Sequence, residues 1–394
     1  MQCCAPGDSL RICRATLDAL ASLQLRLRGP LLRGTIGHTD EKHSEGFRRN
    51  WTAERLRQNR SCIMSSQAPS QVPVSAPGTE RKASRFAGFD WRQYVVYIGF
   101  VVILLFFSIV LSGSGFLNPN NLLNIIRQTA IIAVMAVAVT FVIAAAEIDL
   151  SIGALAGLAS VVTALAIQQY GILAGIAAGL LVGLLVGAIN GFLVTRFGIP
   201  SFLVTLGMLS VAQGVAIWIS QTAPIPILND TYNNIFGSGQ VGPIPSLVIW
   251  PLVFLVVGYV VLRKTSYGRQ VLATGGNVTA ARFSGVNTRR IKFLVFLVSG
   301  TVAGLAGMLY AGHLQSGRFT WGQGDELSVI AAVILGGTSL FGGAGTVIGS
   351  VFGALLIGLI NNGLVLMGLD VSQQLIVRGV IIILAVALAR KSAS

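Results

Sequence analysis

A succession of apolar stretches fills residues 94–389, and it limits the chain to very few folds. A stretch of roughly 20 apolar residues is long enough to cross a bilayer as an α-helix. Lipid offers no hydrogen-bonding partners, so a spanning segment must satisfy its own backbone groups, as a helix does. Only 11% of the chain is charged, against about 25% in soluble domains. We therefore predict an all-α polytopic membrane protein.

Ten membrane spans can be placed in this region. The chain contains 47 glycines, which suit helices that pack closely together in lipid. The predicted spans cover residues 94–112, 126–146, 149–168, 171–195, 200–220, 246–262, 291–312, 326–342, 344–366 and 372–389.

Two boundaries between spans are too short for an ordinary loop. Only residues 147–149 separate the second span from the third, and FGGAG at 341–345 separates the eighth from the ninth. A further glycine pair stands at 336–337. Such breaks are typical of helices that stop within the membrane, where freed backbone groups face protein or a wet cavity. We expect some of the spans to be broken helices.

A faint internal similarity relates the two halves of the membrane region. GAINGFLV at 187–194 resembles GLINNGLVL at 358–366, and each segment follows an acidic pair, within residues 147–149 and at 325–326. The similarity relates the fourth span to the ninth, and an offset of five spans gives the two copies opposite orientations. It predicts a five-plus-five inverted repeat. Chance similarity among Gly/Ala/Leu-rich helices is the alternative.

Positive charge is distributed unevenly about these spans. With the N-terminus inside, the cytoplasmic segments carry 14 of the 17 Lys and Arg residues after Met64, the exceptions being Arg127, Arg318 and Arg378. Cytoplasmic loops of membrane proteins carry such an excess. We therefore predict that both termini are cytoplasmic. The same distribution accounts for the net charge of +14, so no nucleic-acid partner is expected.

The chain before the first span has a different composition. Residues 1–64 hold 11 of the 28 basic residues and no apolar run long enough for a span or a secretory signal. Residues 64–93 form a Ser/Pro/Ala-rich tail that leads into a basic segment, as in many cytoplasmic N-termini. We expect Met64 to be the biological start and residues 1–63 to be an upstream extension of the reading frame. A disordered or short helical appendage is the alternative.

Residue patterns for catalysis are missing from the sequence. No GxxxxGK[ST] phosphate loop occurs, so nothing in the chain is built to hold ATP. The only histidine after Met64 is His313, and no Ser/His/Asp or Cys/His set accompanies it. The four cysteines all precede Met64 and lack the spacing of a zinc site or a disulfide framework. We expect no catalytic, cofactor or metal site, and we predict that the chain is not an enzyme.

The longest polar stretch inside the membrane region is residues 263–292, with seven basic residues and no acidic one. Asn277 can cap a short helix over residues 278–284, because its side chain accepts a backbone N–H of the first turn. Gly285 stands where a left-handed residue ends such a helix. A generic basic loop would explain the charge. It would not explain a capped helix whose Phe283 is placed to enter a groove.

Several segments match one family in sequence order. They are YGRQVLATGGNVTAARFSGVNTRRIK (267–292), EIDLSIGALAGL (147–158), NGFLVTRFGIPSFLVTLGML (190–209) and the long block at 324–364. Together they resemble the bacterial sugar ABC-importer permeases of the ribose type, which also carry xylose and galactosides. The resemblance covers residues 90–390, and residues 1–63 fall outside it.

This resemblance implies a permease domain over residues 94–390, embedded in the lipid of the bacterial inner membrane. Two copies of the chain would form the pathway. A separate ABC ATPase subunit would use ATP, and a periplasmic or surface substrate-binding protein would deliver the solute. The resemblance places contact with the ATPase in the loop at 263–290, at Gly268, Asn277, Ala280, Ala281, Arg282, Phe283 and Gly285.

Polar groups in or near the spans are candidates for the solute path, because charge in lipid is costly and usually faces water or the bundle interior. Asp149 can instead cap the next helix, which its position favours over solute contact. The neutral residues can hold helices together by hydrogen bonds, and this interpretation is the more favoured one. The candidates are Glu147, Asp149, Asn190, Thr205, Gln213 and Asn361.

From the residues and the resemblance we expect a permease subunit that carries a monosaccharide such as ribose. Branched-chain amino acids, nucleosides or a signalling furanose are alternative solutes within the same superfamily. An ion-driven secondary transporter and a membrane scaffold without transport are the alternatives from other classes. Binding of an ATPase subunit would separate the ABC permease from both of these.

Overall fold

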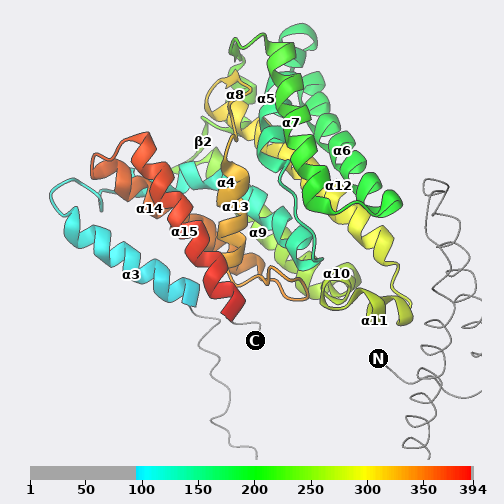
Figure 1. Cartoon of the computed structure of the whole chain (residues 1–394). Helices are drawn as coiled ribbons and strands as arrows, with labels where there is room; N and C mark the ends of the chain where they lie inside the picture. Colours follow the sequence, from blue (N-terminus) through cyan, green and yellow to red (C-terminus); the bar gives the residue numbers. More distant parts are fainter. Residues whose placement is uncertain (1–94, 392–394) are drawn as a thin grey trace, which may run out of the picture. The chain divides into compact units, whose positions relative to one another are not determined.

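The structure is a computed structural model that describes residues 95–391 (Figure 1). The expectations for residues 1–63 and for the tail at 64–93 lie outside the described residues. Within the described part, helices account for nearly all of the regular structure.

Ten helices coincide with the ten predicted spans. The first half contains α3 (Val95–Val110), α4 (Pro119–Ala144), α5 (Ile152–Tyr170), α6 (Ile172–Phe197) and α7 (Ser201–Ser220). The second half contains α9 (Ser246–Lys264), α12 (Thr288–His313), α13 (Asp325–Leu335), α14 (Val347–Leu366) and α15 (Val371–Lys391). Among the described residues, seven helices (α4 to α7, α9, α12 and α14) are long and apolar enough to cross a membrane. The all-α polytopic prediction is confirmed.

Short elements connect the long helices at both ends of the bundle. Helices α10 (Ser266–Gly276) and α11 (Val278–Phe283) lie at one end, and α8 (Asp230–Phe236) lies at the other (Figure 1). Two small antiparallel pairs join β1 (Ile225–Pro226) to β4 (Ser316–Gly317) and β2 (Gln240–Val241) to β3 (Ile244–Pro245).

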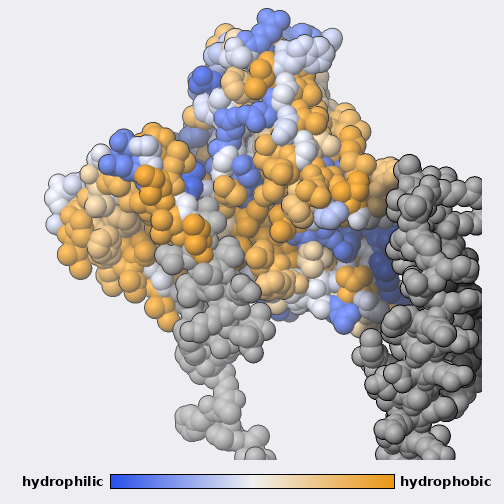
Figure 2. All heavy atoms as spheres, in the orientation of Figure 1, coloured by the Kyte–Doolittle hydropathy of each residue, from blue (hydrophilic) through white to orange (hydrophobic). Residues whose placement is uncertain are grey.

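The surface also differs between the sides of the helices and the two ends of the bundle. Figure 2 shows hydrophobic residues over the sides of the helices and hydrophilic residues gathered toward the α8 end and around α10 and α11. An apolar band between two polar ends is the surface that a bilayer requires of a spanning protein.

The eighth span is broken, but not where the sequence placed its end. Helix α13 ends at Leu335, not at residue 342, and residues 336–346 form a loop before α14. Gly337 and Gly342 have φ of 87° and 81°, a conformation that is costly for residues with a side chain. These glycines turn the chain early, so the predicted span boundary was wrong although the predicted break is present.

A non-helical segment leads into α13 from the other side. Residues 317–324 pack along α5, where side chains are small. A Cβ on Gly157 would lie 2.8 Å from the carbonyl oxygens of both Phe319 and Trp321, and one on Gly322 would lie 2.5 Å from the carbonyl oxygen of Gly153. The segment thus packs on protein along α5, with Gly317 and Gly322 buried, the condition under which non-helical backbone is tolerated in a membrane domain.

Helices α6 and α12 approach each other backbone to backbone. A Cβ on Gly183 would lie 2.3 Å from the carbonyl oxygen of Gly300, and a Cβ on Gly300 would lie 2.4 Å from that of Gly183. Gly187 and Gly304 continue the same contact. Glycine is what allows this separation, because close packing of bare backbones drives helix association in lipid.

The contacts between helices repeat across the two halves. Helix α5 packs against α6 and α7, and α13 packs against α14 and α15. Helix α6 packs on α12 of the other half, just as α14 packs on α4. The sequence DLS at 149–151 precedes α5, and ELS at 326–328 lies in the first turn of α13. This correspondence supports the predicted five-plus-five inverted repeat.

The α6–α12 contact generates a stability prediction. Gly183→Ala should destabilise the permease by about 1–3 kcal/mol, because its Cβ meets a carbonyl oxygen that cannot move without shifting a helix. Gly214→Ala on α7 is the matched control, since nothing lies within 4 Å of its Cβ. Alanine is favoured over glycine in an open helical position by up to about 1 kcal/mol. The melting temperatures of the detergent-purified variants should therefore move in opposite directions, and equal values would contradict the close contact.

Candidate functional site

Helices α10 and α11 form a capped element, called here the α10–α11 element (Ser266–Phe283). The Thr265 hydroxyl accepts the N–H of Gly268 at 3.2 Å, and the Asn277 side chain accepts the N–H of Ala280 at 2.9 Å. Gly285, with φ of 84°, follows the end of α11. The predicted cap and left-handed stop are confirmed, and the helix covers residues 278–283 within the predicted 278–284. Helix α10 was not predicted.

The α10–α11 element presents one large apolar side chain to solvent. Phe283 is 89% exposed, whereas Ala281 on the same short helix is buried. The Arg282 guanidinium donates from Nε to the hydroxyl of Thr288 at 2.9 Å, which ties α11 to the start of α12. An exposed phenylalanine on a fixed helix outside the apolar band is typical of a protein contact.

The element is attached to the bundle through backbone contacts. A Cβ on Gly275 would lie 1.9 Å from the carbonyl oxygen of Ala144, the last residue of α4. The same carbonyl accepts the N–H of Gly343, in the loop between α13 and α14, at 3.0 Å. A displacement of α10 would therefore reach both α4 and this loop directly, because no flexible side chain lies between them.

An aromatic pair, one close backbone contact and one long hydrogen bond complete the attachment. The ring of Tyr267 stacks on Phe141 of α4, with centroids 6.2 Å apart. Burial raises the pKa of the Tyr267 hydroxyl to about 12, so this group stays neutral. A Cβ on Gly268 would lie 2.1 Å from the carbonyl oxygen of Leu262, which fixes α10 against the end of α9. Arg263 Nη2 also donates to the carbonyl oxygen of Gly345 at 3.5 Å.

Four buried polar side chains meet near the α10–α11 end of the bundle, and they are called here the first-half cluster: Asp149, Ser151, Asn190 and Ser299. Asp149 Oδ1 accepts the Ser151 backbone N–H at 3.0 Å and the Ser151 hydroxyl at 2.6 Å. Asp149 Oδ2 accepts the Ser299 hydroxyl at 2.7 Å, and Asn190 Nδ2 donates to Ser151 Oγ at 3.0 Å. The cluster joins α5, α6 and α12.

The cluster corrects the interpretation of Asp149 as the N-cap of the next helix. Helix α5 begins at Ile152, so Ser151 occupies the capping position. Asp149 lies two residues earlier and is only 1% exposed. Asp149 Oδ2 accepts a hydrogen bond from the Ser299 hydroxyl of α12. It therefore does not bond a second backbone N–H of α5.

Two more predicted path residues lie beside this cluster. Glu147 is buried and forms an ion pair with Lys292 of α12. The Thr205 hydroxyl, also buried, donates to the carbonyl oxygen of Ser201 at 2.9 Å and lies 3.3 Å from that of Ile148. Glu147, Asp149, Asn190 and Thr205 are thus brought together and bonded to other parts of the bundle, as expected for groups that hold helices together.

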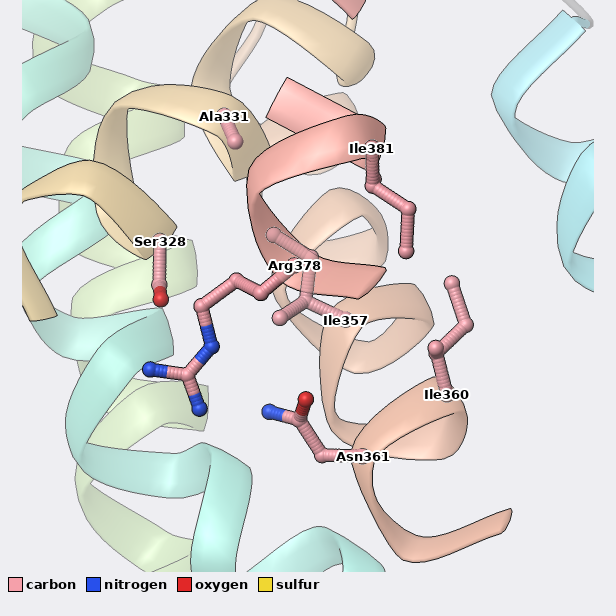
Figure 3. Close-up of a pocket in the computed structure, with 7 residues that line it drawn as sticks. All are labelled: Ser328, Ala331, Ile357, Ile360, Asn361, Arg378 and Ile381. Carbon is pink, nitrogen blue, oxygen red and sulfur yellow. The ribbon is translucent and has the colours of Figure 1, made fainter. Parts of the chain in front are cut away.

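The remaining two candidates lie elsewhere. Gln213 is half-buried on α7. Asn361 of α14 lines a small cavity with Ser328 of α13 and Arg378 of α15, and Figure 3 shows the Arg378 guanidinium lying between the other two side chains. Ser328, Asn361 and Arg378 are called here the second-half cluster. The structure does not bring the six predicted residues to one site.

Sequence reasoning missed several polar partners inside the bundle. Asn121 and Asn362 exchange two hydrogen bonds of 3.0 Å between α4 and α14. The Tyr310 hydroxyl donates to Asp325 at the start of α13. Arg378 was noted only as a basic residue on no predicted cytoplasmic segment. Its place inside a predicted span was the signal that could have identified it, since charge there is rare.

Comparisons with known proteins agree on one class of protein, the permease components of transport systems. The family described as "Branched-chain amino acid transport system / permease component" matches residues 121–386. The ribose import permease protein RbsC of Bacillus subtilis (strain 168) is 38% identical over 318 residues, 80% of this chain and 98% of the relative. The D-allose transport system permease protein AlsC of Escherichia coli (strain K12) is 36% identical over 327 residues, 80% of this chain and 97% of the relative.

A third relative carries a different sugar in its name. The L-arabinose ABC transporter permease protein AraH of Azospirillum brasilense is 34% identical over 330 residues, 82% of this chain and 96% of the relative. No solved structure gives a significant match.

The ion pair of Lys292 and Glu147 generates a second stability prediction. Lys292→Gln should lower the free energy of unfolding by about 2 kcal/mol, because it leaves the buried Glu147 carboxylate without its charged partner. Arg289→Gln removes an exposed charge from the same helix start and is the control. Adding Glu147→Gln to Lys292→Gln should restore part of the loss. Chemical unfolding of the purified variants measures this, and equal stability of the Lys292 and Arg289 variants would show that the ion pair does not hold α12.

Proposed function

The chain belongs to the permease family described as that of the branched-chain amino acid transport system, and we propose that it is the membrane subunit of an ABC importer for a monosaccharide. The observation that carries this proposal is the α10–α11 element, a capped helix pair with Phe283 exposed and backbone contacts to the bundle. A rigid element of this kind can receive movement from a separate motor subunit and pass it to the spans.

The solute class follows from the relatives. Their names specify ribose, D-allose and L-arabinose, and the alignments cover nearly their whole lengths. Because these three sugars differ, they support a monosaccharide without selecting one. The amino-acid transport named by the family description remains the alternative solute class.

We propose three protein partners for the chain. An ABC ATPase subunit binds the α10–α11 element and supplies ATP hydrolysis, so the chain itself needs no ATP site. A substrate-binding protein docks at the opposite, α8 end, and a second copy of the chain completes the pathway. The charge distribution supports this arrangement: with the α10–α11 end and both termini in the cytoplasm, 14 of the 17 basic residues after Met64 lie on the side where membrane proteins carry an excess of Lys and Arg.

Movement would pass from the ATPase into the bundle by two routes. One runs through Gly275 to Ala144 and the loop at 336–346, where backbones touch. The other runs from Arg282 through Thr288 along α12 to Lys292. Both end beside the first-half cluster, which joins α5, α6 and α12 at the same end. Rearrangement of that cluster would open or close the pathway toward the cytoplasm.

The ATPase contact generates the first functional prediction. Phe283→Ala should weaken ATPase binding about thirtyfold, since truncating an aromatic anchor in a groove costs about 2 kcal/mol. Uptake should fall accordingly, while membrane insertion and solute capture by the binding protein stay normal. Co-purification of the cognate ATPase and uptake of radiolabelled ribose measure these effects. Phe192→Ala, which truncates a half-exposed phenylalanine on α6, is the matched control.

If Phe283→Ala imports at the wild-type rate with the ATPase still bound, the coupling role of the α10–α11 element is wrong. Uptake that persists with no ATPase present would favour the ion-driven secondary transporter.

The proposed orientation generates the second functional prediction. In a background with the four native cysteines replaced by serine, Thr279→Cys should resist a membrane-impermeant thiol reagent in intact cells, and Ser238→Cys should react. Both side chains are exposed, so only the membrane separates them from the reagent in this test. Labelling of Thr279→Cys with protection of Ser238→Cys would reverse the proposed topology.

A further inference from the structure

The inverted repeat places equivalent residues in the two polar clusters. Ser151 and Ser328 end the corresponding DLS and ELS segments, and Asn190 and Asn361 end the corresponding GAIN and GLIN segments. In the first half the serine and asparagine bond each other directly, with Asn190 Nδ2 donating to Ser151 Oγ at 3.0 Å. In the second half their counterparts line a cavity, and the Arg378 guanidinium lies between them (Figure 3). The serine and asparagine are bonded to each other in the first half, where only Asn190 Oδ1 lacks a partner among the described residues, whereas Ser328 forms no such bond in the second half.

The second-half cluster has buried polar groups without partners. Ser328 is only 1% exposed, and within the described residues neither its hydroxyl nor Nε of Arg378 has a hydrogen-bond partner. Buried groups of this kind are rare in folded proteins and are costly when unsatisfied. An arginine within a membrane span is rarer still and usually marks a solute or ion path.

The charged groups around the cavity, Arg378 and Asp325, indicate what kind of solute it could bind. Arg378 lies close enough for its positive charge to act on the carboxylate of Asp325, which the Tyr310 hydroxyl also bonds. This nearby acidic group makes the cluster less suited to an anion than an isolated arginine would be. It offers a serine hydroxyl, an amide and a guanidinium. A neutral polyol matches these groups because each of its hydroxyls both donates and accepts hydrogen bonds.

We propose that Ser328, Asn361 and Arg378 form a subsite of the translocation path that hydrogen-bonds the hydroxyls of a neutral sugar. This inference rests on the proposed function. Four apolar side chains complete the lining of this cavity: Ala331, Ile357, Ile360 and Ile381. The cavity has a volume of about 10 Å³, room for one water molecule at most. The subsite therefore admits a sugar only after α15 moves away from α13 and α14. Helix α15 can do so because residues such as Leu375, Ile376 and Val380 leave its other face exposed.

Ser328→Ala tests the subsite with little risk to the fold, since the hydroxyl that it removes has no protein partner. Ser246→Ala is the matched control, because its buried hydroxyl also lacks a partner among the described residues but lies at the start of α9, outside the cavity. The complete importer, reconstituted with its ATPase and binding protein, is assayed with ribose, D-allose and L-arabinose as probes. Loss of one hydrogen bond to the sugar predicts a three- to tenfold lower maximal uptake rate for Ser328→Ala. Ser246→Ala should match wild type.

A second variant separates hydrogen bonding from charge. Arg378→Lys keeps the positive charge near Asp325 but removes Nε and the planar donor fork. It should lower the maximal uptake rate of the same sugar, while the melting temperature and the affinity of the binding protein stay unchanged. Wild-type uptake rates in both Ser328→Ala and Arg378→Lys would overturn the subsite alone. A wild-type importer that carries none of the three sugars would contradict the proposed function, and the sugar subsite with it.

Discussion

Direct contact between backbones at glycine positions is the constraint on which the rest of this structure depends. It joins α6 to α12 through Gly183 and Gly300, and it seats the non-helical segment 317–324 on α5 through Gly157. It also fixes α10 against the end of α4 through Gly275. In lipid, helices gain little from burying apolar side chains, so close packing of this kind must supply the association. The same contacts leave no flexible layer between the α10–α11 element and the spans, as the proposed transmission of movement requires.

The polar groups follow from this packing. Helices that approach so closely can bury a carboxylate only where partners converge on it, as Ser151 and Ser299 do on Asp149. The repeat then places an equivalent serine and asparagine, Ser328 and Asn361, in the other half, where Arg378 stands between them. One sequence pattern thus serves two purposes. The first cluster holds three helices together beside the α10–α11 element, and we propose that the second offers donors and acceptors to a solute.

Local signals in the sequence predicted a large part of this architecture. Apolar length located ten helices, seven of which are long and apolar enough to cross a membrane among the described residues. Asn277 and Gly285 located α11, because capping depends on neighbouring residues only. The end of the eighth span was misplaced, since the turn at Gly337 competes with an apolar run that continues to residue 341. The sequence could not indicate which distant residues form hydrogen bonds with each other in the fold. Nothing near Asp149 in the sequence indicates Ser299, 150 residues away, and the separation of Asn361 from Asn190 follows from the placement of whole helices.

The central claim is that ATP hydrolysis in a separate subunit drives sugar import through this chain by way of the α10–α11 element. The most direct measurement is accumulation of labelled ribose, D-allose or L-arabinose in proteoliposomes that contain the permease, its cognate ATPase and its binding protein. ATP is supplied on the α10–α11 side, or a proton or sodium gradient is imposed in its place. The account predicts accumulation of at least one sugar with ATP and none with either gradient alone. Accumulation driven by an ion gradient in vesicles without the ATPase would contradict it.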